Sequence, residues 1–210
     1  MLVNVCIVTR NKAITITTLH MLLHLSGKCY SSGQHQICIH FVDSTKHIPK
    51  LIKTSDRILW VNYGHSLDAD SFDKIFNFTS DVLVFPSVKE GVNWDRFRKN
   101  VAEDSKEPLH QYGMEFDTEI GTKVSDGVWT VTKSNPAVFV IDCKATDKKM
   151  RTRKGDGIKL PRDIDQIFEK FQEHDVKIHA WTKANIIAHF THECVGNILE
   201  ANGVNCQQGA

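Results

Sequence analysis

The chain has 210 residues, a length that suits one domain or one domain with a modest insertion. Its 41% hydrophobic and 24% charged residues are ordinary for a globular protein, and its net charge of +1 lacks the positive excess of nucleic-acid-binding proteins. No apolar run reaches the roughly 18 residues of a membrane-spanning helix, so we expect neither a nucleic-acid partner nor insertion into a membrane.

The first half of the chain alternates between strand-like and helix-like segments. Short apolar runs rich in β-branched residues predict buried strands. Ile16, Leu19 and Leu23 share one face of the first predicted helix, which Gly27 ends. The predicted elements are a strand at 3–9, a helix at 13–25, a strand at 35–43, a short helix or turn at 44–53, a strand at 56–61, a helix at 68–78 with Phe72, Ile75 and Phe76 inward, and a strand at 81–87.

The second half begins with a polar, irregular stretch. Its predicted elements are a short helix at 93–101, strands at 126–132 and 136–145, a helix at 163–175 with Ile164, Ile167, Phe168 and Phe171 on one side, a strand at 176–182 and a closing helix at 192–203. The basic segment 144–162 is either a solvated loop or a lid over an anionic ligand. Together the two halves predict an α/β fold with a mixed, mostly parallel central sheet flanked by helices.

Polar groups follow several predicted strands, and ligands of open α/β sheets bind outside the carboxyl ends of the strands. An arginine at such an end pairs with phosphate, an aspartate accepts from a ribose hydroxyl or a base N–H, and a glycine lets the backbone approach a diphosphate closely. The groups at these ends are Thr9, Arg10, Asn11, Asp43, Asn62, Tyr63, Gly64, His65, Lys89 and Glu90.

Several common motifs are absent from the sequence. There is no Gly-x-Gly-x-x-Gly or P-loop pattern, which argues against a dinucleotide fold and a P-loop kinase, and no Gly-x-Ser-x-Gly elbow of a hydrolase. His189 and His192 have zinc-ligand spacing but no second ligand cluster at a suitable distance.

The cysteines and the N-terminus bear on the compartment. The six cysteines are scattered and form no Cys-x-x-Cys pair, which predicts reduced thiols, with one buried disulfide as the alternative. The first ten residues read as a strand rather than a signal peptide, because they lack a leading positive region and a cleavage site. We therefore expect a cytoplasmic protein.

The order of these pieces resembles the GT-A fold glycosyltransferases. "IVTRN" (7–11) is similar to the nucleotide-binding start of that fold, and "ILWVNYGHSLDADSFDKI" (58–75) to its metal-binding strand and following helix. "RDIDQIFEKFQEHDVKIHAWTKANIIAH" (162–189) resembles the late acidic motif, helix, strand and terminal histidine. With "FPSVKEGVNWDRF" (85–97), the chain looks close to the N-terminal domain of a chlorella-virus glycosyltransferase that decorates a capsid glycoprotein.

The resemblance implies transfer of a sugar from a UDP-sugar donor to a hydroxyl of a glycan or glycoprotein acceptor, in viral capsid glycosylation. It implies one glycosyltransferase domain over 1–210, with a nucleotide-binding half at about 1–92 and an acceptor half at about 93–210. For a viral protein the compartment is the host cytoplasm, and further domains of a longer chain are implied. A divalent metal, Mn²⁺ before Mg²⁺, is the implied cofactor.

The metal-binding triplet of the family maps onto Asn62-Tyr63-Gly64, not onto the nearby pair Asp68 and Asp70. Asp68 is either a helix cap or a metal ligand folded back toward the diphosphate, with His65 or His189 as a nitrogen ligand. An asparagine brings no charge to a metal, which argues against tight metal dependence. Arg10 and the basic run 148–154 are then candidates to share the neutralisation of the diphosphate.

The late acidic motif maps onto Asp163 as catalytic base and Asp165 as its neighbour, although Asp163 also suits a helix N-cap. Asp142, which ends a predicted strand, and Glu193 are further candidates. A retaining enzyme needs no such base.

Two alternatives remain. A nucleotidyltransferase needs a glycine-rich loop after the first strand, and "TRNKAIT" has no glycine. A non-catalytic nucleotide-sugar or glycan-binding domain is favoured by the missing acid at 62.

Overall fold

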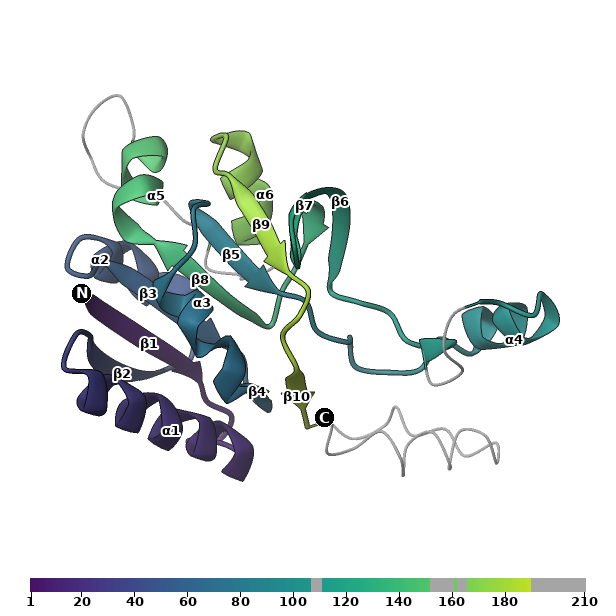
Figure 1. Ribbon diagram of the computed structural model, residues 1–210, viewed down its shortest axis with the longest axis horizontal. Coiled ribbons are helices and arrows are strands. Elements are labelled where there is room, and N and C mark those ends of the chain that lie inside the picture. Colours follow the sequence, from purple (N-terminus) through teal and green to yellow (C-terminus); the bar gives the residue numbers. More distant parts are fainter. Residues whose placement is uncertain (107–110, 152–160, 162–165, 190–210) are drawn as a thin grey trace. The chain divides into compact units, whose positions relative to one another are not determined.

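The structure, a computed structural model, describes residues 1–106, 111–151, 161 and 166–189 (Figure 1). The chain divides into two compact units, one of residues 1–87 and 117–188 and one of residues 88–116 and 189–210. The predicted division into functional halves near residue 92 stays a prediction.

The first unit contains an eight-stranded sheet in the order β2-β1-β3-β8-β5-β9-β7-β6 and a two-stranded sheet of β4 and β10. The strands are β1 (Leu2–Val8), β2 (Gln36–Val42), β3 (Arg57–Val61), β4 (His65–Leu67), β5 (Val82–Phe85), β6 (Thr118–Ser125), β7 (Val128–Ser134), β8 (Val138–Asp142), β9 (Ile178–Trp181) and β10 (Ile186–Ala188).

The fold is α/β with a large mixed sheet, but the expectation of a mostly parallel sheet is wrong. Within the described strands of the large sheet, three neighbouring pairs are parallel and four are antiparallel. The physical reason is that β8 lies antiparallel between β3 and β5, and that the hairpin of β6 and β7 adds two more antiparallel pairings. Strand–helix alternation along the first half of the chain does not reveal these later insertions.

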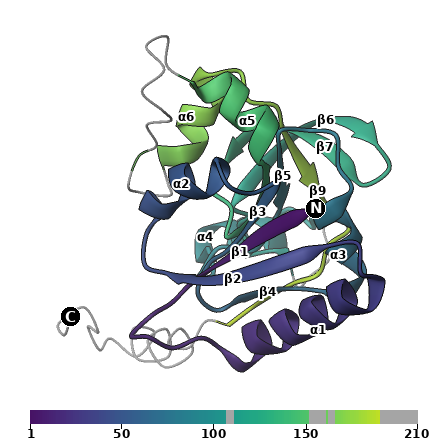
Figure 2. The same cartoon turned by 90° about the vertical axis from the view of Figure 1, so that its left-hand side faces the viewer.

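Helices cover both faces of the sheet in the first unit (Figure 2). On one face α1 and α3 pack over a core centred on Leu59 and Val140, and on the other α2, α5 and α6 pack over Trp60 and Phe139. The helices are α1 (Ile16–Ser32), α2 (Ile48–Ile52), α3 (Phe72–Phe76), α4 (Trp94–Ala102), α5 (Cys143–Met150) and α6 (Ile167–Glu173), with short 3-10 helices η1 (Thr45–His47) and η2 (Ala69–Ser71). None of the helices among the described residues is long and apolar enough to cross a membrane.

The first helix differs from its prediction in both its end and its packed face. It runs through Gly27 and ends at Gly33, whose φ of 63° is the left-handed conformation that suits glycine at a helix C-terminus. Ile16 is 79% exposed and Leu23 is 60% exposed, so the predicted apolar face lies outward. The residues that α1 buries are Thr18, Met21, Leu22, Leu25 and Cys29.

Most other predicted elements lie within a few residues of the observed ones. The inward residues of α3 are confirmed, as are the three described inward residues of α6, Ile167, Phe168 and Phe171. The strands β4, β6 and β10 and the helix α5 were not predicted. The predicted closing helix at 192–203 and most of the basic segment lie outside the described residues.

The second unit is described by itself. Val88 pairs with Phe116 in an antiparallel bridge, and the Lys89 amide donates to the Glu115 carbonyl at 2.7 Å. Asn93 caps α4, because its Oδ1 accepts from the Arg96 amide at 2.9 Å.

The four cysteines that the structure describes are free thiols: Cys6, Cys29, Cys38 and Cys143. This confirms the prediction of reduced thiols for those four. Burial raises the pKa of Cys6 and the pKa of Cys143 to about 12, whereas Cys38 is exposed on the edge strand β2.

A thiol-reactive probe is expected to modify Cys38 in the native protein and to spare Cys6 and Cys143. A pKa about three units above that of an ordinary thiol lowers the thiolate fraction by about 1000-fold, and burial also blocks the probe. Peptide mass mapping after timed labelling checks this, with urea-unfolded protein as the control in which all three react. Equal native labelling of Cys38 and Cys143 would contradict the packing of α5.

Candidate functional site

The parallel strands β2, β1 and β3 create a topological switch point at one edge of the sheet. The chain leaves β1 through α1, which packs on one face, to reach β2 on one side of β1. It then returns through α2 on the opposite face to reach β3 on the other side (Figure 2). The three strands are parallel, so their carboxyl ends lie together at this edge, and ligands of open α/β sheets bind outside such ends.

A tight turn follows the end of β1 at this edge. Arg10 and Ala13 form an antiparallel bridge, with hydrogen bonds of 3.3 Å and 2.9 Å between their backbones. Asn11 and Lys12 at the turn have φ of 52° and 62°, a left-handed conformation that non-glycine residues adopt at a cost of about 1–2 kcal/mol each. The turn leaves the side chains of Arg10 and Lys12 exposed.

Asn62 follows the end of β3 at the same edge and is held by three hydrogen bonds. Its amide donates to the Ala137 carbonyl at 2.8 Å, and its own carbonyl accepts from the His65 amide at 3.1 Å. Its side-chain Oδ1 accepts from Trp60 Nε1 at 2.9 Å. Since an indole N–H only donates, this bond fixes the asparagine oxygen toward Trp60 and leaves its Nδ2 for other partners.

The next residues link this edge to the small sheet. Gly64 is buried with φ of 78°, a conformation that glycine adopts without a steric penalty. His65 Nδ1 lies 3.0 Å from the Tyr63 carbonyl, and the Thr18 hydroxyl of α1 donates to the His65 carbonyl at 2.8 Å. The strand β4 then pairs with β10, so the backbone after the triplet is anchored by both α1 and β10.

Two further groups lie at the ends of β1 and β2. The Thr9 amide donates to the Val42 carbonyl at 3.0 Å, which joins the two strand ends. Asp43 follows Val42 and is exposed; the Ser44 hydroxyl, and then Lys46, hold the pKa of Asp43 below its ordinary value. Its carboxylate is therefore ionised at neutral pH and suited to accept from hydroxyl or N–H groups.

Asp117 is a polar residue near this edge that the sequence did not point to. Its carboxylate accepts from the Ser87 amide at 3.1 Å, the Ser87 hydroxyl at 2.6 Å, the Thr118 hydroxyl at 2.9 Å and the Ala137 amide at 3.2 Å. Ser87 follows β5 and Ala137 precedes β8, so Asp117 joins the ends of two neighbouring strands. Ser87 and Ala137 lie 30 and 20 residues away from Asp117 in sequence, so no local sequence pattern identifies Asp117 as the residue that joins them.

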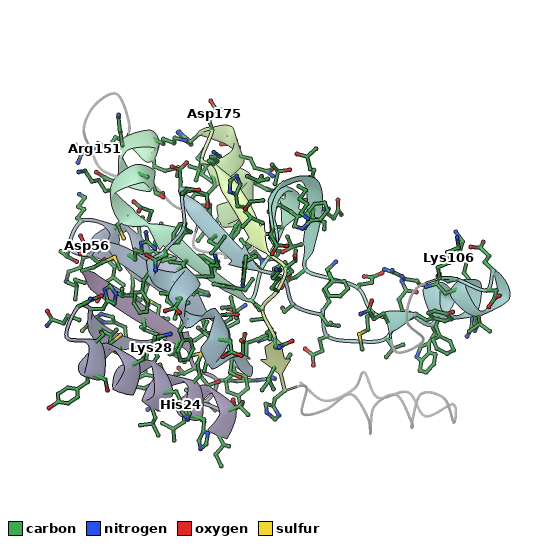
Figure 3. All side chains as sticks on the ribbon, in the orientation of Figure 1. His24, Lys28, Asp56, Lys106, Arg151 and Asp175 are labelled. Carbon is green, nitrogen blue, oxygen red and sulfur yellow. The ribbon has the colours of Figure 1, made fainter. Side chains whose placement is uncertain are left out.

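The structure does not bring Asp142 to this edge. Asp142 ends β8, which is antiparallel to β3, and it pairs in register with Arg57 at the start of that strand. It therefore lies at the opposite edge of the sheet, where the amide of the next residue, Cys143, donates to the carbonyl of Asp56 at 3.0 Å; Asp56 is labelled in Figure 3. There Asp142 caps α5 by accepting from the Ala145 amide at 3.0 Å.

The remaining predicted site residues belong to the second unit or lie outside the described residues. Lys89, Glu90 and His189 belong to the second unit, in which Lys89 Nζ lies 3.8 Å from Glu115. Asp163 and Asp165 lie outside the described residues, so their catalytic role stays a prediction.

Asp68 caps the 3-10 helix η2, the first of the two roles weighed for it. Its Oδ2 accepts from the Ser71 amide at 3.2 Å, and its Oδ1 accepts from the Asn185 amide at 2.9 Å. The Asp68 amide in turn donates to the Asn185 carbonyl at 3.2 Å. Both carboxylate oxygens are thus used to tie η2 and the segment before β10 together.

Replacing Asp68 by alanine is expected to lower the free energy of unfolding by about 1–2 kcal/mol, because a cap and a second backbone hydrogen bond are lost. Binding of nucleotide and its response to Mn²⁺ are expected to stay unchanged. Urea unfolding and calorimetric titration measure the two quantities. Asp70→Ala, an exposed neighbour, is the control for stability, and a metal response abolished by Asp68→Ala alone would make Asp68 a metal ligand.

The described residues at this edge do not fit a tightly held divalent cation. The triplet Asn62-Tyr63-Gly64 contains no carboxylate, the Asn62 oxygen accepts from Trp60, and both Asp68 oxygens accept backbone N–H groups. Among the residues that the structure describes, no three of His, Cys, Asp or Glu gather in a metal-binding group.

The chain matches no protein-family model and no curated protein. Among solved structures, the crystal structure of A197 from STIV is similar with a TM-score of 0.49 and 10% sequence identity, covering 90% of this chain and 86% of that chain.

Proposed function

We propose that the chain is a glycosyltransferase that moves a sugar from a UDP-sugar donor to a hydroxyl of a glycan or glycoprotein acceptor. The observation that carries this proposal is the edge at which the parallel strands β2, β1 and β3 end, because Arg10, Lys12 and Asn62 follow two of those strand ends. Hydrogen-bond donors and cations at the carboxyl ends of such strands suit the diphosphate of a nucleotide. The sequence resemblance to GT-A enzymes supplies the reaction class.

Each residue at the edge has a role in this proposal. Arg10 and Lys12 pair with phosphate oxygens, and Gly64 lets the diphosphate approach the backbone after β3. The ionised Asp43 accepts from the ribose or the base. Thr9 and Asn11 shape the turn that carries the cations, and Tyr63 and His65 form the wall that continues into β4.

The transfer breaks the bond between the anomeric carbon and the diphosphate oxygen and forms a bond from that carbon to the acceptor oxygen, with UDP as leaving group. In an inverting course the acceptor proton passes to a carboxylate, for which Asp163 is the proposed base and Asp165 its neighbour. A retaining course needs no such base. Capsid glycoprotein as acceptor and the host cytoplasm as location follow from the resemblance to a viral domain.

The proposal is tested by titrating the purified protein with UDP and then assaying UDP release from UDP-glucose and UDP-galactose with a mixed glycan acceptor. At 100 times its dissociation constant, UDP is expected to raise the free energy of unfolding by about 2.7 kcal/mol. Turnover of either sugar supports transferase activity. Failure of UDP and of both UDP-sugars to bind under any condition overturns the proposal.

A binding domain without turnover is the second candidate. The observation that favours it is the triplet Asn62-Tyr63-Gly64, which lacks the acids that the transferase family uses to hold its metal. The same assay separates the two functions, because a binding domain is stabilised by a UDP-sugar and releases no UDP from it.

A further inference from the structure

The chemistry at the end of β3 is that of a hydrogen-bond donor. A metal ligand at position 62 has to be the side-chain oxygen, and the Asn62 oxygen carries no charge and already accepts the Trp60 indole N–H at 2.9 Å with one of its two lone pairs. Flipping the amide would set two N–H donors against each other at that distance. The half-buried Asn62 side chain therefore presents Nδ2, which has no acceptor within the described part of the chain.

Cationic donors follow the neighbouring strand end at the same edge. Arg10 and Lys12 are both exposed, and neither forms an ion pair with a described residue. Asp43 at the neighbouring strand end is engaged by Lys46 at 3.3 Å and by the Ser44 hydroxyl at 3.1 Å. The two strand ends thus offer two positive charges and an amide donor.

The register of the strands places the segments that carry these groups next to each other at this edge. Ile7 of β1 lies opposite Val61 of β3. Asn62 directly follows Val61, and Arg10 is three residues after Ile7, so both lie just beyond this pair. The turn that carries Lys12 is closed by the bridge between Arg10 and Ala13 and does not depend on a ligand.

We propose that this edge binds a diphosphate directly, through Asn62 Nδ2 and the side chains of Arg10 and Lys12, without a divalent cation at the Asn62-Tyr63-Gly64 triplet. The inference rests on the proposed function for the identity of the nucleotide, but the diphosphate chemistry stands apart from it. Protein donors replace the charge that a metal supplies to the leaving group in the related fold.

The first experiment titrates the protein with UDP and, separately, with inorganic pyrophosphate, each in EDTA and in Mn²⁺. The expected result is that the affinity of each ligand differs by less than about threefold between EDTA and Mn²⁺. Binding of UDP only with Mn²⁺ overturns the inference and leaves the proposed function intact. Metal-free binding of pyrophosphate without any binding of UDP supports the inference and overturns the proposed function, and binding of neither ligand overturns both.

The second experiment introduces an acid into the Asn62-Tyr63-Gly64 triplet. The substitution is Asn62→Asp, which keeps an acceptor for the Trp60 indole N–H. In EDTA the new carboxylate faces the diphosphate, so UDP affinity is expected to fall by about tenfold or more, and Mn²⁺ is expected to recover it. Asn77→Asp adds the same charge at the end of α3, near Arg57 at the opposite edge, and is the control. Unchanged affinity of Asn62→Asp in EDTA argues against contact between Asn62 and the diphosphate.

The third experiment removes a cation from the turn. Arg10→Ala is expected to weaken metal-free UDP and pyrophosphate binding by about tenfold, the effect of losing one charge-assisted hydrogen bond. Arg98→Ala, an exposed arginine of α4, is the matched control. If the Arg10 and Arg98 variants bind UDP and pyrophosphate with equal affinity, Arg10 does not contact the diphosphate. This result holds even if the Asn62 variant fails to fold.

Discussion

Replacing Asp117 by alanine is expected to lower the free energy of unfolding by about 3–5 kcal/mol. Asp117 is only 9% exposed, and its carboxylate accepts four hydrogen bonds, two of them from Ser87. Alanine leaves the amides of Ser87 and Ala137 buried without their acceptor. Urea unfolding followed by circular dichroism measures the loss. A decrease in the free energy of unfolding below about 1 kcal/mol would contradict the role of Asp117 in joining these strand ends.

Two further variants show whether the loss comes from the network. Asp117→Asn keeps one acceptor oxygen but turns an amide donor toward the N–H groups, so its stability is expected to lie between those of the parent and the alanine variant. Glu119→Ala removes an exposed carboxylate two residues away on β6 and is expected to leave the unfolding midpoint nearly unchanged.

The Asp117 network also bears on the candidate site. Ala137 donates its amide to Asp117 and accepts the Asn62 amide with its carbonyl at 2.8 Å. Loss of the carboxylate therefore frees the backbone that holds Asn62 in place. Variants that fold but loosen this strand end are expected to bind UDP more weakly, with no change in the thiol labelling of Cys38 on β2.

The interior strands could be predicted from the sequence because burial on both faces demands continuous apolar runs. Every residue of β3 and β5 is buried, and both strands were predicted to within two residues. The packed face of α1 could not be predicted. Its buried side includes Thr18 and Met21, whose polar atoms contact the His65 carbonyl and the Leu67 amide. His65 and Leu67 are 47 and 46 residues away from Thr18 and Met21, so the contacts that favour burial of this face over the face of Ile16 and Leu23 form only in the tertiary structure.

The candidate site was predictable in part for a similar reason. The ends of β1, β2 and β3 share an edge because these strands are parallel, and this followed from the strand–helix alternation. The contact of Trp60 with Asn62 joins residues two apart, which lie on one face of a strand. Asp142 also ends a strand, but β8 runs in the opposite direction, and strand direction is set by long-range pairing that the local pattern does not encode.

Asp142→Ala is expected to lower the free energy of unfolding by about 2–3 kcal/mol and to leave UDP binding per folded molecule unchanged. The variant loses the cap of α5 and the carboxylate 3.8 Å from the buried Arg57 guanidinium. Burial lowers the pKa of Arg57 and Asp142 raises it, so the cation is stabilised by this partner.

Asp142→Asn separates the two contributions to that loss. Asparagine caps helices about as well as aspartate but brings no charge, so this variant is expected to lose about half as much stability as the alanine variant. Arg57 keeps its hydrogen bond to the Ile75 carbonyl at 2.7 Å and its position over the Phe78 ring in both variants, which limits the damage to the capped end of α5. Urea unfolding and UDP titration of the three proteins measure the effects. If sugar transfer disappeared in Asp142→Asn while stability and UDP binding persisted, Asp142 would be the catalytic base, and the acceptor would have to reach the opposite edge of the sheet from the diphosphate.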